Sequence, residues 1–198
     1  SSLAMKGYTA NLPILAEAAS QNGFFTISPD SDGIVRKAPL ILEHNNQLYS
    51  SLAVEAVKLY LGANQEALQV QSETIGEVQT ITQVTLAGQR IHTDATGQVL
   101  IPYLGPTSTF PYISATDVLN NHPIPDLTDA IVIIGTSALG LVDLRTTPLQ
   151  TSYPGVEVQA TLIHALLNPE QIPYTPEWKD GATIVLLALL TLFMMALF

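Results

Sequence analysis

The last seventeen residues of the chain, Ala182 to Phe198, read ATIVLLALLTLFMMALF and contain no charged residue, no Gly and no Pro. A helix of a soluble domain usually keeps a polar stripe, whereas this one would be apolar all round. At about 1.5 Å per residue it would cover roughly 25 Å of a hydrocarbon core about 30 Å thick. Trp178 and Lys179 precede it, as is typical of a membrane interface. We therefore expect residues 181–198 to begin a transmembrane helix, with a buried core helix as the alternative.

The remaining residues, 1–180, have the size of a single domain and an acidic composition. The chain has seven Lys and Arg residues and seventeen Asp and Glu residues, which gives a net charge of −10. This balance excludes nucleic acid as a partner, because phosphate binding needs a basic surface. It is compatible with the translocated side of a membrane. The chain has no Cys, and its four His residues lack ligand spacing, so we expect no disulfide, no metal and no cofactor.

The first half of the chain alternates between helix and strand patterns. Residues 11–20 predict a short helix capped by Asn11. Residues 23–27 and 34–42 predict two strands of one hairpin, joined by the turn SPDSDG. A helix capped by Ser50 or Ser51 is expected over residues 52–61 and ends at Gly62.

The second half contains strands first and helices later. Residues 68–104 alternate between apolar and polar residues and predict an antiparallel meander. A short helix is expected from Ser114, and a longer one over residues 156–167. Between them, the run AIVIIG at 130–135 predicts a strand covered on both faces, as in a parallel sheet. The pattern predicts an α/β domain with a mixed central sheet flanked by helices, or alternatively an α+β domain.

A catalytic interpretation of the segment after this strand is weak. Ser137, Asp143 and His164 occur in the order of an α/β-hydrolase triad, but Leu139 stands where the nucleophile elbow needs a second Gly. We therefore assign no catalytic residue, and an exported serine hydrolase is a remote alternative.

The glycines of the same segment do not form a nucleotide-binding loop. Gly135 and Gly140 have the spacing of a phosphate loop, but Leu141 and Val142 replace its Lys and Ser or Thr. A turn after a buried strand could still offer backbone N–H groups to a ligand, or be only a tight turn.

The best candidates for a binding site are Asp143 and Arg145, which lie in the loop before the last predicted helix. Arg145 could hold a carboxylate or phosphate, or could pair with Asp143 or Glu157 only to hold the loop, which is the commoner use of such a pair. Glu157, Thr161 and His164 share one helix face, which is either solvated or part of a polar pocket with Asp143. The ligand-site hypothesis comprises Tyr103, Gly135, Asp143, Arg145, Thr147, Glu157, Thr161 and His164.

Four segments together resemble the type 2 CHASE domain, a bacterial extracytoplasmic sensory module. They are GFFTISPDSDGIVRKAPLIL, LYSSLAVEAVKLYLG, VLIPYLGPTSTFPYISATDVLNN and IVIIGTSALGLVDLRTTPLQTSYPGVEVQATLIHALL. The positions that match the family pattern are Asp32, Gly33, Arg36, Tyr103, Gly105, Gly135, Asp143, Arg145, Pro148, Pro154, Gly155 and Glu157. The resemblance marks no ligand among them, and it implies that residues 1–180 lack the first part of the family's domain.

The resemblance also implies a function. Members of the family lie between membrane spans and are followed inside the cell by an adenylate or guanylate cyclase, a histidine kinase or a Ser/Thr kinase. We therefore expect a periplasmic sensor, attached to the bacterial inner membrane, that senses a small molecule or a protein and is not itself an enzyme. A homodimer is expected, because symmetric dimers are the commonest assembly. A module for protein interaction or dimerisation, without a small ligand, is the alternative.

Overall fold

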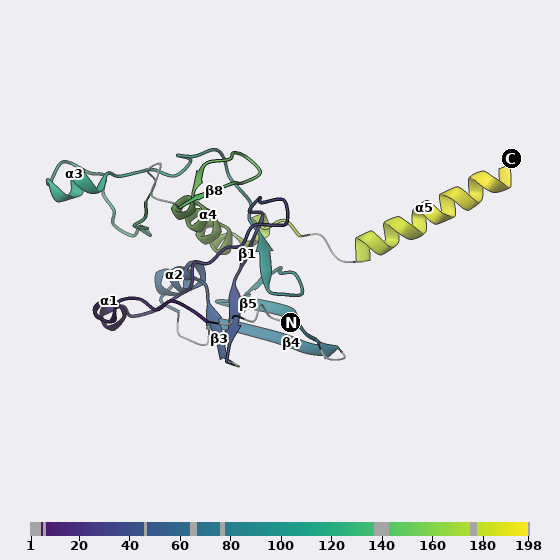
Figure 1. Ribbon diagram of the computed structural model, residues 1–198, viewed down its shortest axis with the longest axis horizontal. Coiled ribbons are helices and arrows are strands. Elements are labelled where there is room, and N and C mark those ends of the chain that lie inside the picture. The colour runs from purple at the N-terminus through teal and green to yellow at the C-terminus, as the bar shows by residue number, and fades with distance from the viewer. Residues whose placement is uncertain are drawn as a thin grey trace.

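The computed structural model describes residues 5, 7–45, 47–63, 67–75, 78–136, 143–174 and 178–197. Helices and strands together form a folded body, from which the last helix projects (Figure 1). The helices are α1 (Pro13–Ala18), α2 (Leu52–Tyr60), α3 (Ala115–Leu119), α4 (Gly155–Leu167) and α5 (Trp178–Leu197), and the short 3₁₀ helix η2 (Pro169–Gln171) follows α4. The predicted α/β class is confirmed.

The described strands form four small antiparallel sheets rather than one central sheet. β4 (Leu68–Ile75), β5 (Val78–Leu86) and β6 (Gln89–Ile91) make a three-stranded meander, which confirms the prediction over residues 68–91. The predicted meander extended to residue 104, but residues 98–100 pair with residues 37–39 instead. The other sheets are pairs: β1 (Lys37–Pro39) with β7 (Gln98–Leu100), β2 (Ile41–His44) with β3 (Gln47–Ser50), and β8 (Leu144–Arg145) with β9 (Tyr153–Pro154).

The helix starts and ends follow local capping chemistry. Ser51 caps α2, because its Oγ accepts a hydrogen bond from the N–H of Val54 at 3.3 Å, and Gly62 after the helix has a φ of 61°. Ser114 caps α3 in the same way. The predicted cap of α1 is wrong: the helix begins at Pro13, after Leu12, and has no side-chain cap.

The core lies between α2, α4 and the small sheets. Helices α2 and α4 pack against each other through their apolar faces. Fully buried side chains include those of Leu40, Ile41, Val54, Val57, Ile91, Tyr153, Val158 and Leu162. Most side chains of helix α4 beyond its first two residues are therefore buried in the domain.

The turn at residues 30–34 is confirmed, but the hairpin predicted around it is not. The backbone N–H of Asp30 bonds to the carbonyl of Ile34, and Gly33 has a φ of 82°. Arg36 pairs with Asp32 at 2.7 Å and holds the pKa of that carboxyl at about 2. Residues 23–27 make only an isolated bridge, at Phe24, and residues 34–42 contribute β1 and β2 to other pairings. The partners of these strands come from later in the chain, which a local pattern does not reveal.

The strand predicted at residues 130–135 is also wrong. The residues of this run are all described, and none is in a strand. Val132 and Ile134 are 57% and 95% exposed, because no described strand pairs with the run and nothing covers both of its faces.

The apolar C-terminal segment forms helix α5, which begins at Trp178 and carries the charged residues Lys179 and Asp180 in its first turn. Among the residues that the structure describes, no helix is both long and apolar enough to cross a membrane. The expectation that residues 181–198 begin a transmembrane helix stays a prediction.

Candidate ligand site

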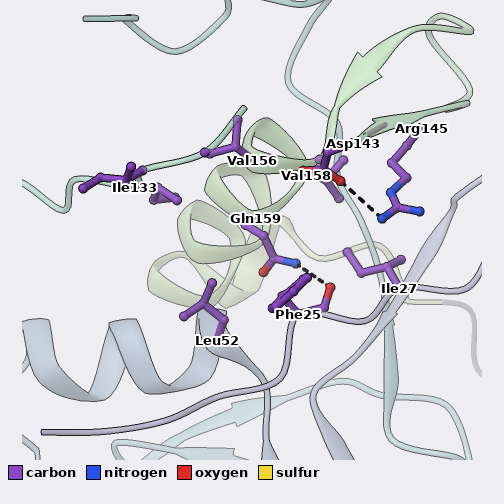
Figure 2. A pocket seen from close by; sticks show the side chains of 12 residues that line it. Phe25, Ile27, Leu52, Ile133, Asp143, Arg145, Val156, Val158 and Gln159 are labelled. Atoms are coloured by element: carbon purple, nitrogen blue, oxygen red, sulfur yellow. Dashed lines mark hydrogen bonds and ion pairs between the residues drawn. The ribbon is translucent and has the colours of Figure 1, made fainter. Parts of the chain in front are cut away.

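A cavity of about 310 Å³ opens beside the N-terminal end of α4 (Figure 2). Its walls are mainly apolar and come from segments far apart in the sequence: Phe25, Ile27, Leu52, Ile133, Val156 and Val158. The polar side chains that line it belong to Asp143, Arg145 and Gln159. Apolar walls with a few converging polar groups are the usual composition of a small-molecule site.

Asp143 and Arg145 form an ion pair at one end of this cavity (Figure 2). Nη2 of Arg145 donates to Oδ1 of Asp143 at 3.2 Å, and both side chains are more than one-third exposed. Strand β8 carries Arg145, and its pairing with β9 brings both residues to the start of α4. In the described part of the chain, this is the one hydrogen bond of the guanidinium. Most of its N–H groups can therefore meet a ligand.

Two glycines allow this close packing around the first turn of α4. A Cβ at Gly155 would collide with the carboxylate of Asp143, and the backbone N–H of Gly155 donates to the Asp143 carbonyl at 2.8 Å. A Cβ at Gly135 would lie 2.7 Å from Cβ of Val156. The carboxylate of Asp143 therefore lies at the positive end of the helix dipole.

Gln159 contributes a buried acceptor to the cavity. The residue is 7% exposed, and its Nε2 donates to the carbonyl of Phe25 at 3.5 Å. No described residue donates to Oε1 of Gln159. If the amide were turned round, Oε1 of Gln159 would face the carbonyl oxygen of Phe25, which is unfavourable. The buried Oε1 therefore needs a hydrogen-bond donor.

Glu157 does not line the cavity but holds a neighbouring loop. Its carboxylate accepts hydrogen bonds from the backbone N–H groups of Ser108, Thr109 and Phe110 at 3.1, 2.9 and 3.4 Å. The hydroxyl of Tyr112 donates to the same carboxylate at 2.8 Å. Burial and this hydrogen bond raise the pKa of Tyr112, so its hydroxyl stays protonated and continues to donate.

Thr161 and His164 lie on the same side of α4 as Glu157. The hydroxyl of Thr161 donates to the carbonyl of Glu157 at 2.9 Å, and the ring of His164 packs edge-on against Phe110. The helix face therefore meets the loop at residues 108–112. The shared polar pocket with Asp143 is not formed.

Two further predicted residues make structural contacts outside the cavity. Tyr103 donates to the carbonyl of Val35 at 3.0 Å and packs edge-on against Tyr153, while burial raises its pKa. Thr147 is buried, and its hydroxyl donates to the carbonyl of Gln150 at 3.1 Å. Of the eight predicted residues, the cavity thus brings together Gly135, Asp143 and Arg145.

The sequence interpretation missed Gln159 and the apolar walls. Gln159 could have been suspected, because it is a polar residue one turn beyond Gly155 in a helix with otherwise apolar neighbours. Phe25 and Leu52 gave no signal, since their approach to α4 depends on tertiary packing.

The remaining chemical hypotheses have no support in the described residues. Ser137, and with it the hydrolase alternative, lies outside them. Among the described residues, no group of His, Asp and Glu is arranged to hold a metal ion.

The CHASE2 domain family model matches residues 3–193, and the chain therefore belongs to the CHASE2 domain family. Neither the curated proteins nor the solved structures compared with the chain gave a match. CHASE2 is a family of extracytoplasmic sensory domains and not of catalytic ones. The family membership confirms the resemblance found in the sequence and assigns a sensory role to the chain.

Proposed function

We propose that this chain is the input domain of a membrane-bound bacterial receptor and that its stimulus is a small molecule bound in the cavity beside α4. The observation that carries the proposal is the buried, unsatisfied acceptor of Gln159 inside a cavity with apolar walls and a charged pair. A buried acceptor without a donor costs free energy, which a ligand that donates to it would recover.

Helix α4 supplies a path from the cavity to the C-terminal end of the domain. Val156 and Gln159 line the cavity, while Leu162 and Leu166 are buried in the core further along the helix. The buried Ile172 follows η2, and the chain then continues to α5. A ligand that binds one position of α4 more tightly than another would shift the population of receptor states.

Helix α5 is the proposed connection to the membrane. The helix projects away from the folded body (Figure 1), and its apolar side chains are exposed, for example those of Leu186 at 68% and Met195 at 78%. Burial in lipid would remove this surface from water at about 25 cal/mol per Å². The output would come from a domain in the cytoplasm: a cyclase domain would form a cyclic nucleotide, and a kinase domain would transfer a phosphoryl group.

The test is the output of the complete receptor in bacterial membranes, measured as cyclic nucleotide formed or phosphate transferred. We expect Asp143→Ala, Arg145→Ala and the cavity-filling Val156→Phe to change the response to stimulus. The matched control is Arg90→Gln, which removes an exposed positive charge on β6, outside the cavity. An unchanged output in all three cavity variants would refute the cavity as the stimulus site.

A second candidate is a module that dimerises the receptor without a small ligand. Helix α1 favours it, because its residues are all at least partly exposed and Leu12, Ile14 and Leu15 are 67%, 74% and 59% exposed. A second copy of the chain could cover these side chains in a symmetric interface. Sedimentation in mild detergent, which measures the mass of the particle, tests this function. A chain that stays monomeric even at high concentration rules it out.

A further inference from the structure

We propose that the cavity binds an α-amino acid with an apolar side chain, in its zwitterionic form. This inference rests on the proposed function and names the chemical class of the stimulus. The amino acid would place its carboxylate on Arg145, its ammonium group beside Asp143 and Gln159, and its side chain against the apolar walls.

Arg145 provides the site for the carboxylate. Its guanidinium lies at the cavity between Asp143 and Ile27 (Figure 2) and makes one hydrogen bond, to Asp143, within the described residues. Five N–H donors in a planar fork match the two oxygens of a carboxylate. A cation alone would leave these donors unused, so the cavity favours a ligand that carries an anionic group.

Asp143 and Gln159 call for a donor on the same ligand. Within the described residues, Oδ2 of Asp143 accepts no hydrogen bond, and neither does the buried Oε1 of Gln159. A fatty acid has no donor for these oxygens, whereas an ammonium group has three. The two charges of the pair, one on Asp143 and one on Arg145, therefore match the two charges of a zwitterion.

The apolar walls and the size of the cavity select the rest of the molecule. Phe25, Leu52 and Val156 offer no polar side-chain atoms to a ligand, and they lie around Gln159 (Figure 2). A volume of about 310 Å³ is near the lower limit of known ligand sites. A small aliphatic or aromatic side chain fits these walls, whereas a charged or amide side chain would lose its hydration there.

Calorimetric titration of the complete 198-residue chain in mild detergent tests the inference with four probes. L-leucine carries both charges and an apolar side chain, 4-methylpentanoate lacks the ammonium group, and 3-methylbutylamine lacks the carboxylate. L-glutamine keeps both charges but has a polar side chain. We expect L-leucine to bind at least about tenfold more tightly than each of the other three, because each omits a hydrogen-bonded charge or the apolar contact.

Two variants assign the charges to their partners. Arg145→Gln should weaken binding of L-leucine and leave any binding of 3-methylbutylamine unchanged, since the amine has no carboxylate. Asp143→Asn should weaken binding of L-leucine and of 3-methylbutylamine but not of 4-methylpentanoate. The matched control Arg90→Gln should bind all probes as the parent chain does, and circular dichroism checks that each variant is folded.

The outcomes separate this inference from the proposed function. Equal affinity for L-leucine and either analogue, or no binding of L-leucine, overturns the amino-acid ligand whatever the variants do. If Val156→Phe nevertheless changes the output of the receptor, the cavity is a sensory site for another ligand. If L-leucine binds as expected but Val156→Phe leaves the output unchanged, the ligand class stands and the sensory role of the cavity fails.

Discussion

Glu157 shows how one buried carboxylate can organise a loop that has no regular structure. Ser108 adopts a positive φ of 71°, which turns successive N–H groups of the loop toward a common point, and the carboxylate occupies that point. Such a concave group of N–H donors binds anions, and here the anion is part of the protein itself. The sequence placed Glu157 on a polar helix face but gave no means to see the loop that covers it.

Replacing Glu157 by Gln should destabilise the domain. The amide would keep one acceptor but place an NH₂ group against backbone N–H donors, so at least one charge-assisted hydrogen bond is lost. We expect a loss of about 2–3 kcal/mol in the free energy of unfolding, measured by urea denaturation. Glu170→Gln, at an exposed position in η2, is the control and should change stability by less than about 0.5 kcal/mol.

Gly155→Ala tests the packing of Asp143 against the start of α4. In an ordinary helix this change is favourable by up to about 1 kcal/mol. The added Cβ would collide with the carboxylate of Asp143, so we expect the variant to be less stable than the parent and its Asp143–Arg145 pair to be displaced. Thermal unfolding measures the first effect. Gly181→Ala in α5, where a Cβ would meet no atom within 4 Å, is the control. A stabilised Gly155→Ala chain would contradict the close contact.

At the scale of the element, α2 carries a buried ion pair at its interface with the core. Nζ of Lys58 lies 2.9 Å from Oε1 of Glu55, and the two side chains are 4% and 8% exposed. Removing one partner leaves the other charge buried without compensation, which is costly, whereas removing both can be nearly neutral. We therefore expect Lys58→Met to lose about 3–5 kcal/mol and the double variant Glu55→Leu/Lys58→Met to recover most of it. Equal stability of the single and double variants in urea would refute the coupling.

The β1–β7 pair depends on a carboxylate with a lowered pKa. Asp94 accepts hydrogen bonds from Thr96 and Gln98 and pairs with Lys37 on β1 at 3.0 Å. Burial raises the pKa of Asp94, but the hydrogen bonds from Thr96 and the ion pair with Lys37 lower it by more. The net pKa therefore lies below the usual value for Asp. Since the pKa is lower in the folded than in the unfolded state, the stabilisation is complete above about pH 4 and is lost as the pH falls through the folded value.

Asp94→Asn tests this assignment. At pH 7 the variant should lose about 1 kcal/mol, because the pair with Lys37 disappears while the acceptor for Thr96 remains. As the pH falls through the lowered pKa of Asp94, the parent carboxylate becomes protonated, so the difference between the two chains should shrink. Urea denaturation at pH 7 and at successively lower pH values measures this difference. A difference that stays constant with pH would show that the charge of Asp94 is not the cause.

The sequence predictions were accurate where an element depends on contacts between residues close in the sequence, and they failed where it depends on contacts between distant residues. Helices α2 and α3 and strands β4 to β6 were predicted because Ser caps, a terminating Gly and alternating residues act locally. Helix α4 has no side-chain cap and was predicted from its amphipathic pattern. The run at residues 130–135 was taken for a buried strand because apolar runs usually are buried, yet burial depends on a partner, and no strand in the described part of the chain pairs with this run. In the candidate site, Asp143 and Arg145 are two residues apart and were predicted together, whereas Gln159 and Phe25 meet only through tertiary packing.

At the scale of the whole molecule, the proposed function arranges the parts in order from the stimulus site to the membrane. The cavity lies at the N-terminal end of α4, the core fixes the middle of this helix, and its C-terminal end leads through η2 toward α5. Membership of the CHASE2 family gives this arrangement an extracytoplasmic setting. A ligand-sized cavity facing the outside is what a receptor needs, since its stimulus then need not cross the membrane.

The location of the domain can be tested by labelling, because the chain has no Cys of its own. Asn120→Cys would introduce a single thiol at the exposed end of α3. If the domain lies outside the cytoplasm, a membrane-impermeant maleimide added to intact spheroplasts should label the complete receptor as fully as it labels permeabilised cells. The parent chain, which lacks a thiol in this region, controls for labelling elsewhere in the receptor. Labelling that requires permeabilisation would place the domain in the cytoplasm and contradict its role as a receiver of external signals.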